Sequence, residues 1–190
     1  MFGEVLLGIV VILVVFVAIV AKRPSAFHIE RSTSVLAAPD LVFAQLNDFH
    51  AWAAWSPWEK LDPKMARTHS GAPAGVGAAY SWNSENSKVG QGRMTIEKSD
   101  FPSLLVVQLE FIKPFAATNT VTFSIDPLGD GSRVKWAMDG HNGFLGKMLH
   151  LFMDMDKMVG GDFERGLANL RQVAESAPRP AAVAGAVLAR

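Results

Sequence analysis

The chain has 190 residues, no cysteine and a formal net charge of zero, from 18 basic and 18 acidic residues. This length fits one ordinary domain with extensions. The lack of cysteine excludes a disulfide, a thiolate metal site and a cysteine nucleophile. A pI near 7.0 and the absence of a long basic run argue against a nucleic-acid partner. The mean hydropathy of +0.20 is high for a soluble domain, and one segment accounts for much of it.

The N-terminal segment is typical of a membrane anchor. Between Glu4 and Lys22 lie 17 residues without a charged or hydrogen-bonding side chain, and 14 of them are Val, Leu, Ile or Phe. At about 1.5 Å per residue this run spans about 26 Å, slightly less than the roughly 30 Å hydrocarbon core of a bilayer. Its apolar side chains favour insertion by about 4 to 8 kcal/mol. We therefore expect residues 1–23 to form a transmembrane anchor.

Two other interpretations of this segment are a buried core element and a cleaved signal peptide. The run is too long for a strand. A signal peptide would have a positively charged start and a cleavage site of small residues. Here the start holds Glu4, and Lys22-Arg23-Pro24 follows where cleavage would occur. An uncleaved anchor is favoured, and the basic residues on its C-terminal side predict that the following domain lies in the cytoplasm.

The body of the chain alternates apolar and polar residues over short runs, which is typical of strands. After the first run, Ala38-Pro39-Asp40 predicts a helix start, with Val42, Phe43 and Leu46 on its buried face. No helical pattern separates the later runs, which predicts an antiparallel sheet. The strand candidates are residues 28–36, 67–70, 78–82, 92–98, 104–111, 118–125 and 133–139.

The last element has a different period. From Phe144 to Leu170 apolar residues recur every three or four positions, which predicts one amphipathic helix of about thirty residues. Gly160-Gly161 within it indicates a bend or close packing. Residues 177–190, rich in Ala and Pro, are expected to form a disordered tail. The predicted fold class is α+β, with a curved antiparallel sheet of about seven strands around a long C-terminal helix, preceded by one transmembrane helix. Because one helix covers only part of such a sheet, we expect an apolar cavity between them.

A set of short motifs carries a resemblance to a known family. The motifs are Arg31-Ser32, Ala38-Pro39, Trp52 with Trp55-Ser56-Pro57-Trp58-Glu59, Gly75-Val76-Gly77-Ala78, Gly90-Gln91-Gly92-Arg93-Met94 and Lys113-Pro114-Phe115. With the order of the elements, they make residues 27–175 similar to the START-like helix-grip superfamily, also called SRPBCC or Bet v 1-like. Within that superfamily the chain resembles bacterial polyketide cyclase-like proteins with an N-terminal anchor. The resemblance implies a ligand-binding domain over residues 24–176 and, with the anchor, a single-pass protein of the bacterial inner membrane.

The inward-facing side of the predicted sheet and helix supplies the candidate ligand-binding residues. Tyr80 is the only tyrosine and is the candidate polar handle, although a buried or rim tyrosine bonded to backbone is the favoured interpretation. Trp52, Trp55 and Trp58 are candidates for a lid at the cavity mouth, but a small core that fixes an irregular loop to the sheet is favoured. The other candidates for the cavity wall are Trp82, Phe111, Phe123, Trp136, Met138, Phe152, Met155 and Val159.

The sequence offers little for catalysis. Arg93 and Glu97 share a strand face and are a candidate acid–base pair, but a solvated face opposite Met94 and Ile96 is favoured. The five histidines lack metal-ligand spacing, so we expect no metal. The sequence has no Gly-x-Ser-x-Gly elbow, and Gly75-x-Gly77-x-x-Tyr80 lacks the third glycine of a dinucleotide site, so we expect no cofactor and no catalytic residue. The predicted function is membrane-anchored binding of a hydrophobic small molecule or lipid.

Two alternatives are kept. The first is a polyketide cyclase or dehydratase-like enzyme, which a buried Glu97 or Asp139 near Tyr80 would favour. The second is a membrane-tethered scaffold for a protein partner, which a fully packed interior would favour.

Overall fold

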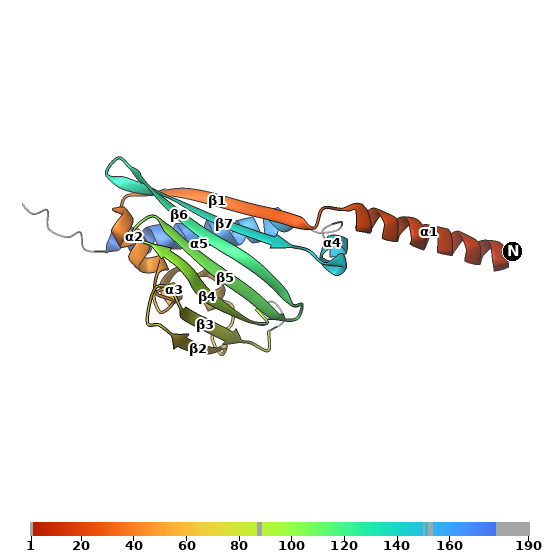
Figure 1. Ribbon diagram of the computed structural model, residues 1–190, viewed down its shortest axis with the longest axis horizontal. Helices are drawn as coiled ribbons and strands as arrows, with labels where there is room; N and C mark the ends of the chain where they lie inside the picture. The colour runs from red at the N-terminus through yellow and green to blue at the C-terminus, as the bar shows by residue number, and fades with distance from the viewer. Residues whose placement is uncertain (1, 87–88, 150, 152–153, 178–190) are drawn as a thin grey trace, which may run out of the picture.

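Seven antiparallel strands form one sheet in the order β1-β7-β6-β5-β4-β3-β2 (Figure 1). The computed structural model describes residues 2–86, 89–149, 151 and 154–177. Strands adjacent in the sheet are also consecutive in the chain, except that β1 pairs with β7. The strands are β1 (Ala26–Val35), β2 (Ala66–Gly71), β3 (Ala78–Asn83), β4 (Gln91–Asp100), β5 (Leu104–Lys113), β6 (Ala117–Leu128) and β7 (Gly131–His141).

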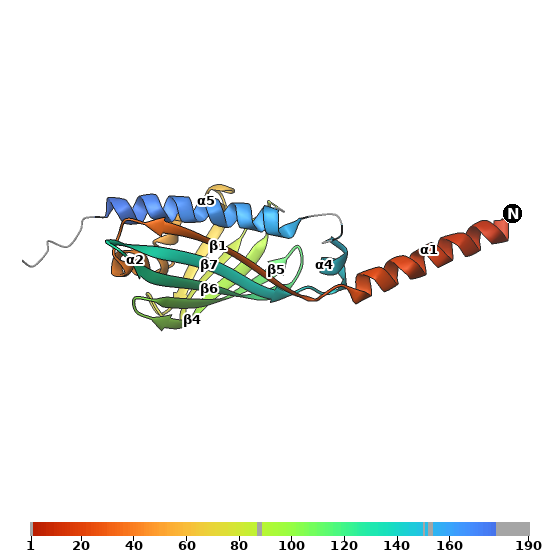
Figure 2. The ribbon, with the colours of Figure 1, turned by 90° about the horizontal axis from the view of Figure 1, so that it is seen from above.

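Helices lie on one side of this sheet and at its ends. The longest described helix of the body, α5, runs along the sheet beside β1, while α2, α3 and η1 connect β1 to β2 (Figures 1 and 2). The predicted α+β fold and its strand order along the chain are confirmed. The helices are α1 (Phe2–Lys22), α2 (Pro39–Leu46), α3 (Trp52–Trp55), the 3₁₀ helix η1 (Pro57–Lys60), α4 (Phe144–Leu149) and α5 (Met155–Ser176).

The two-residue period of the strands produces the core. In β6, Val121 and Phe123 are buried, whereas Thr120, which points to the other face of the sheet, is exposed. Successive strand side chains point to opposite faces, so this pattern buries one face of the sheet. Phe123 pairs in register with Trp136 of β7, and their ring centroids are 4.9 Å apart. Such cross-strand aromatic pairs stabilise the register of the sheet.

The C-terminal helical region differs from the sequence prediction. One continuous helix was expected from Phe144, but the structure has two, α4 and α5. Asp154 stands before α5 with extended backbone angles, and its side chain accepts a hydrogen bond from the Lys157 amide at 3.1 Å. This is an N-cap, which satisfies a free amide of a new first turn and therefore marks a helix start. The apolar period continues across the break and did not reveal it.

The α5 helix is held to the sheet by an apolar stripe and by one arginine. Phe163, Leu167 and Leu170 of the stripe are buried. Near the start of α5, the guanidinium of Arg31 on β1 donates two hydrogen bonds to the Asp156 carboxylate and one to Glu164 at 2.8 Å. This set of bonds, here called the Arg31 clamp, fixes the first turns of α5 against β1.

The α1 helix extends away from the body (Figures 1 and 2). It is long and apolar enough to cross a membrane, and Val20 is its only buried residue among those that the structure describes. The end of α1 contacts α4, where the Lys147 ammonium donates a hydrogen bond to the Ala21 carbonyl at 3.4 Å. Of the predicted tail, only Ala177 lies within the described residues.

Candidate functional site

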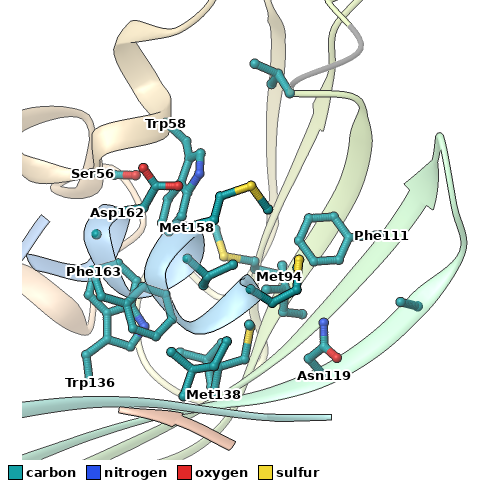
Figure 3. A pocket seen from close by; sticks show the side chains of 18 of the residues that line it. Ser56, Trp58, Met94, Phe111, Asn119, Trp136, Met138, Met158, Asp162 and Phe163 are labelled. Atoms are coloured by element: carbon teal, nitrogen blue, oxygen red, sulfur yellow. The ribbon is translucent and has the colours of Figure 1, made fainter. Parts of the chain in front are cut away.

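A cavity of about 950 Å³ lies between the inner face of the sheet and the N-terminal half of α5 (Figure 3). Its wall is mainly aromatic, aliphatic and methionine side chains from β1 and β3 to β7, with α5 and the α3–η1 segment on the other side. The space exists because α5 packs closely against β1 while β3 and β4 curve away from it (Figure 1). A cavity of this size and lining is typical of sites for small hydrophobic molecules.

The structure brings most of the predicted wall residues together. Phe123 is not among the lining residues: it is fully buried, with its ring between those of Trp52 and Trp55 at 5.8 and 6.1 Å. It faces inward as predicted, but α3 covers its part of the strand. Phe152 lies outside the described residues. The predicted residues that line the cavity are Tyr80, Trp82, Phe111, Trp136, Met138, Met155 and Val159.

The three tryptophans predicted as a lid divide into different roles. Trp55 is fully buried and away from the cavity, and its indole donates a hydrogen bond to the Gln45 carbonyl at 3.1 Å. Trp52 is also buried and donates to the Leu46 carbonyl at 2.9 Å, although one side of it lines the cavity. These bonds fasten α3 to the end of α2, as expected of a small core that fixes this loop. Trp58 is half-buried and lines the cavity beside Trp136 and Phe163 (Figure 3).

A partly buried polar network forms part of the cavity wall through Tyr80 and Glu59. The Tyr80 hydroxyl donates a hydrogen bond to Glu59 Oε1 at 2.5 Å, and Arg67 Nε donates to Glu59 Oε2 at 2.7 Å. Burial of the phenol, followed by its hydrogen bond to the Glu59 carboxylate, raises the pKa of Tyr80 above its ordinary value. The tyrosine therefore stays neutral, and its hydrogen already has an acceptor in the protein.

The second acid of the wall is also paired. Asp162 on α5 accepts a hydrogen bond from Arg165, one turn further along the same helix. Both cavity carboxylates, Glu59 and Asp162, are thus engaged by arginines rather than presented to the interior as a free base. A general base must reach the proton that it removes, and each of these carboxylates already accepts a hydrogen bond from an arginine.

One buried donor on the wall has no acceptor among the described residues. The indole nitrogen of Trp136 is buried and makes no hydrogen bond there. The Trp136 ring stacks on Phe163 at 4.3 Å and 9° and meets Trp55 and Trp58 nearly edge-on. Aromatic faces are weak hydrogen-bond acceptors, so the donor sits in an environment that hardly satisfies it.

The predicted acid–base candidates lie outside the cavity. Arg93 and Glu97 are exposed on β4, which agrees with the solvated face favoured from the sequence. Asp139 is exposed on β7 and bonds to His28 at 2.7 Å. In the part of the chain that the structure describes, no group of three or more His, Asp or Glu could hold a metal ion.

Sequence reasoning missed several wall residues. Glu59 and its partner Arg67, which lies outside the wall, were not recognised, because their meeting with Tyr80 depends on how η1 folds back against β2 and β3. Met94, Leu109 and Asn119 lie on predicted strands and line the cavity; Figure 3 shows Met94 and Asn119. Their alternation gave the correct face, but the position along each strand at which α5 leaves space was not readable from the sequence.

The exposed members of the wall show where the cavity meets solvent. Lys157 and Met158 lie on the first turns of α5, and His141 ends β7; all three are exposed. Leu61, after η1, and Arg165 extend this rim along α5. The cavity is therefore open along the N-terminal half of α5, toward the end of the body from which α1 departs (Figure 2).

Comparisons with known proteins agree with this architecture. Residues 26–175 match the model of a family described as polyketide cyclase / dehydrase and lipid transport. Similar solved structures include protein CV1439 from Chromobacterium violaceum (TM-score 0.58, 14% identity, covering 79% of this chain and 98% of that chain). Protein MLL2253 from Mesorhizobium loti has a TM-score of 0.59 at 12% identity, covering 80% of this chain and 99% of that one. Ara h 8.0201 has a TM-score of 0.53 at 14% identity, covering 77% and 99%.

Identities this low establish a shared fold alone. No curated protein matches the sequence significantly.

Proposed function

Because this chain belongs to the polyketide cyclase/dehydrase and lipid transport family, we propose that it is a membrane-tethered protein that binds a hydrophobic small molecule or lipid. The observation that carries the proposal is the cavity of about 950 Å³ beneath α5 and its mainly apolar wall. Apolar ligand surface buried there contributes about 25 cal/mol per Å² to binding. The ligand-contacting residues that we propose are Tyr80, Trp82, Phe111, Trp136, Met138, Met155 and Val159.

The tether is the second part of the proposal. We propose that α1 crosses the inner membrane once, uncleaved, and that residues 24–176 form the ligand-binding domain. The apolar side chains of α1 have almost no protein partner, and a hydrocarbon environment would cover them. Lys22 and Arg23 directly follow the span, which favours a cytoplasmic domain. A reporter enzyme active only in the periplasm, fused after Arg190, should be inactive; activity would overturn this orientation.

The two alternatives fit the site less well. A scaffold with no ligand has no need of the cavity. A cyclase or dehydratase requires an acid and a base that face the substrate, and the carboxylates of Glu59 and Asp162 are both paired with arginines. Binding without covalent chemistry is therefore the function that the site supports best.

The proposal is tested by what the protein carries out of the membrane. The full chain and its Ala117→Trp variant are purified in parallel, washed with the same detergent and extracted with organic solvent. Ala117 lines the cavity, so the larger side chain occupies ligand space. We expect one lipid or apolar metabolite to be enriched from the wild type over bulk membrane lipid and strongly reduced in the variant. Extracts that match bulk lipid for both proteins would overturn the proposal.

A further inference from the structure

We propose that α4 rests on the surface of the bilayer beside α1 and thereby places the open end of the cavity at the membrane. This inference rests on the proposed membrane span by α1. The proposed partner of the α4 surface is the headgroup region of a lipid bilayer that contains anionic lipid. The consequence is that a ligand passes between the bilayer and the cavity without crossing bulk water.

The first observation is a continuous connection from α1 to the cavity rim. Ser25 follows the end of α1, and its carbonyl accepts a hydrogen bond from the Asn142 amide at 2.7 Å. Asn142 and the preceding His141 line the cavity, and α4 begins two residues later. The Lys147 ammonium of α4 in turn bonds to the Ala21 carbonyl at the end of α1. The rim, α4 and the end of α1 therefore form one connected unit.

The second observation is the apolar character of the side chains at this end. Phe144 and Leu145 of α4 are 49% and 43% exposed. Ile112 and Phe115, around the turn between β5 and β6, are also exposed, and this turn lies at the same end of the body (Figure 1). Aromatic and aliphatic side chains in this arrangement are typical of helices and loops that lie in a membrane interface.

Exposure alone does not select this end, because Leu36, Phe101 and Leu128 are exposed elsewhere. The charge distribution distinguishes this end from the other exposed apolar sites. The three segments at this end, residues 19–29, 111–117 and 140–149, contain Lys22, Arg23, Lys113 and Lys147 and no acidic residue. The acids next to these segments in the chain are Glu30, Glu110 and Asp139, at their borders. At the start of α5, Asp154 and Asp156 are paired with Lys157 and Arg31. A basic surface with exposed apolar residues is complementary to an anionic bilayer surface.

The test uses the cysteine-free sequence. A single cysteine is placed at Leu145 and labelled with a small environment-sensitive fluorophore, in the full chain held in nanodiscs of phosphatidylcholine and phosphatidylglycerol. The matched control is Leu128→Cys, because Leu128 is 44% exposed and lies at the β6–β7 turn, at the opposite end of the body (Figure 1). A third label at Leu13 reports whether α1 spans the bilayer. Phe144→Cys replaces Leu145→Cys should the latter fail to fold.

Lipids with a nitroxide near the headgroup then quench the labels according to depth. We expect quenching at position 145 to exceed that at position 128 by about twofold or more, while position 13 is quenched by nitroxides deep in the acyl chains. Equal quenching at 145 and 128, with position 13 quenched, overturns the docking of α4 and leaves the tether standing. If deep nitroxides do not quench position 13, the tether is wrong, and the docking proposal fails with it.

Discussion

The guanidinium of Arg31 occupies the space beside the α-carbon of Gly160 in which any other residue would place its β-carbon. Gly160 thus leaves room for the guanidinium, and the Arg31 clamp depends on it. The same clamp lowers the pKa of Asp156 through its hydrogen bond from Arg31. The Arg31 motif noted in the sequence and Gly160, the first glycine of the pair in the helix, therefore form one contact.

Alanine substitutions at the two adjacent glycines should have opposite effects. Gly161→Ala meets nothing closer than Arg165 at 3.9 Å, so it should raise stability by up to about 1 kcal/mol through helix propensity. Gly160→Ala has the same propensity gain but forces Arg31 out of its hydrogen bonds, so we expect a lower melting temperature than wild type. Thermal unfolding followed by circular dichroism measures both. Equal stabilisation by both substitutions would show that the Arg31 clamp contributes nothing to stability.

The ionisation of Tyr80 is directly observable because the chain has one tyrosine. Burial and the Glu59 hydrogen bond raise its pKa above the ordinary 10.0. The pKa of Tyr80 is higher in the folded than in the unfolded protein. The contribution of neutral Tyr80 to the free energy of unfolding is therefore fully present below pH 10 and is lost as the pH rises through the folded-state pKa. Tyrosinate absorbance should therefore appear well above pH 10 in the folded protein.

Glu59→Gln is the control for this titration. It removes the negative carboxylate but leaves the phenol buried, so the pKa of Tyr80 should fall toward 10.0 and remain above it. Tyr80→Phe should lose the absorbance change altogether. A wild-type titration at the ordinary value would mean that Tyr80 is exposed to solvent and does not form the network.

The tryptophans of the α3–η1 segment should respond differently to truncation. Trp55→Ala leaves a large void in the core and an unpaired Gln45 carbonyl, and should cost about 3 to 5 kcal/mol in the free energy of unfolding. Trp58→Ala removes a half-buried wall residue and should cost less, while weakening ligand binding. Chemical denaturation gives both values. Unchanged stability in Trp55→Ala with lost binding would restore the lid interpretation.

The fold was largely predictable because its main signals are local. Alternation in β6 and β7 predicted their strands and inward faces, and Ala38-Pro39-Asp40 predicted the start of α2. The break before α5 was missed because apolar residues keep a helical period on both sides of it. Asp154 is a residue type that favours an N-cap, but the continuous apolar period around it hides the helix start.

The site was predictable only in part because it depends on contacts between distant segments. Tyr80 and Glu59 are 21 positions apart, and only the turn of η1 brings them together. Phe123 was assigned to the correct face, but α3 covers it, and no local pattern indicates which part of a strand another element will cover. The size of the cavity likewise depends on the curvature of the sheet, which individual strand patterns do not specify.

A tryptophan introduced on the cavity face or on the opposite face of β6 should distinguish an effect on ligand binding in the cavity from an effect on stability. Ala117 faces the cavity and Thr118 is exposed on the opposite face. Ala117→Trp should reduce the affinity for a hydrophobic fluorescent fatty acid by about tenfold or more, because a good part of the apolar burial is lost. Thr118→Trp should bind as wild type does. Equal affinities for the two variants would place the fatty acid outside this cavity.

Native mass spectrometry of the full chain released from its own membrane tests cavity binding most directly. We expect a one-to-one adduct of a lipid or apolar metabolite that persists at activation energies which strip loosely bound lipid from α1. The Ala117→Trp variant, released in the same way, should lose that adduct. A bare protein mass for the wild type, or the same adducts in both proteins, would contradict the account.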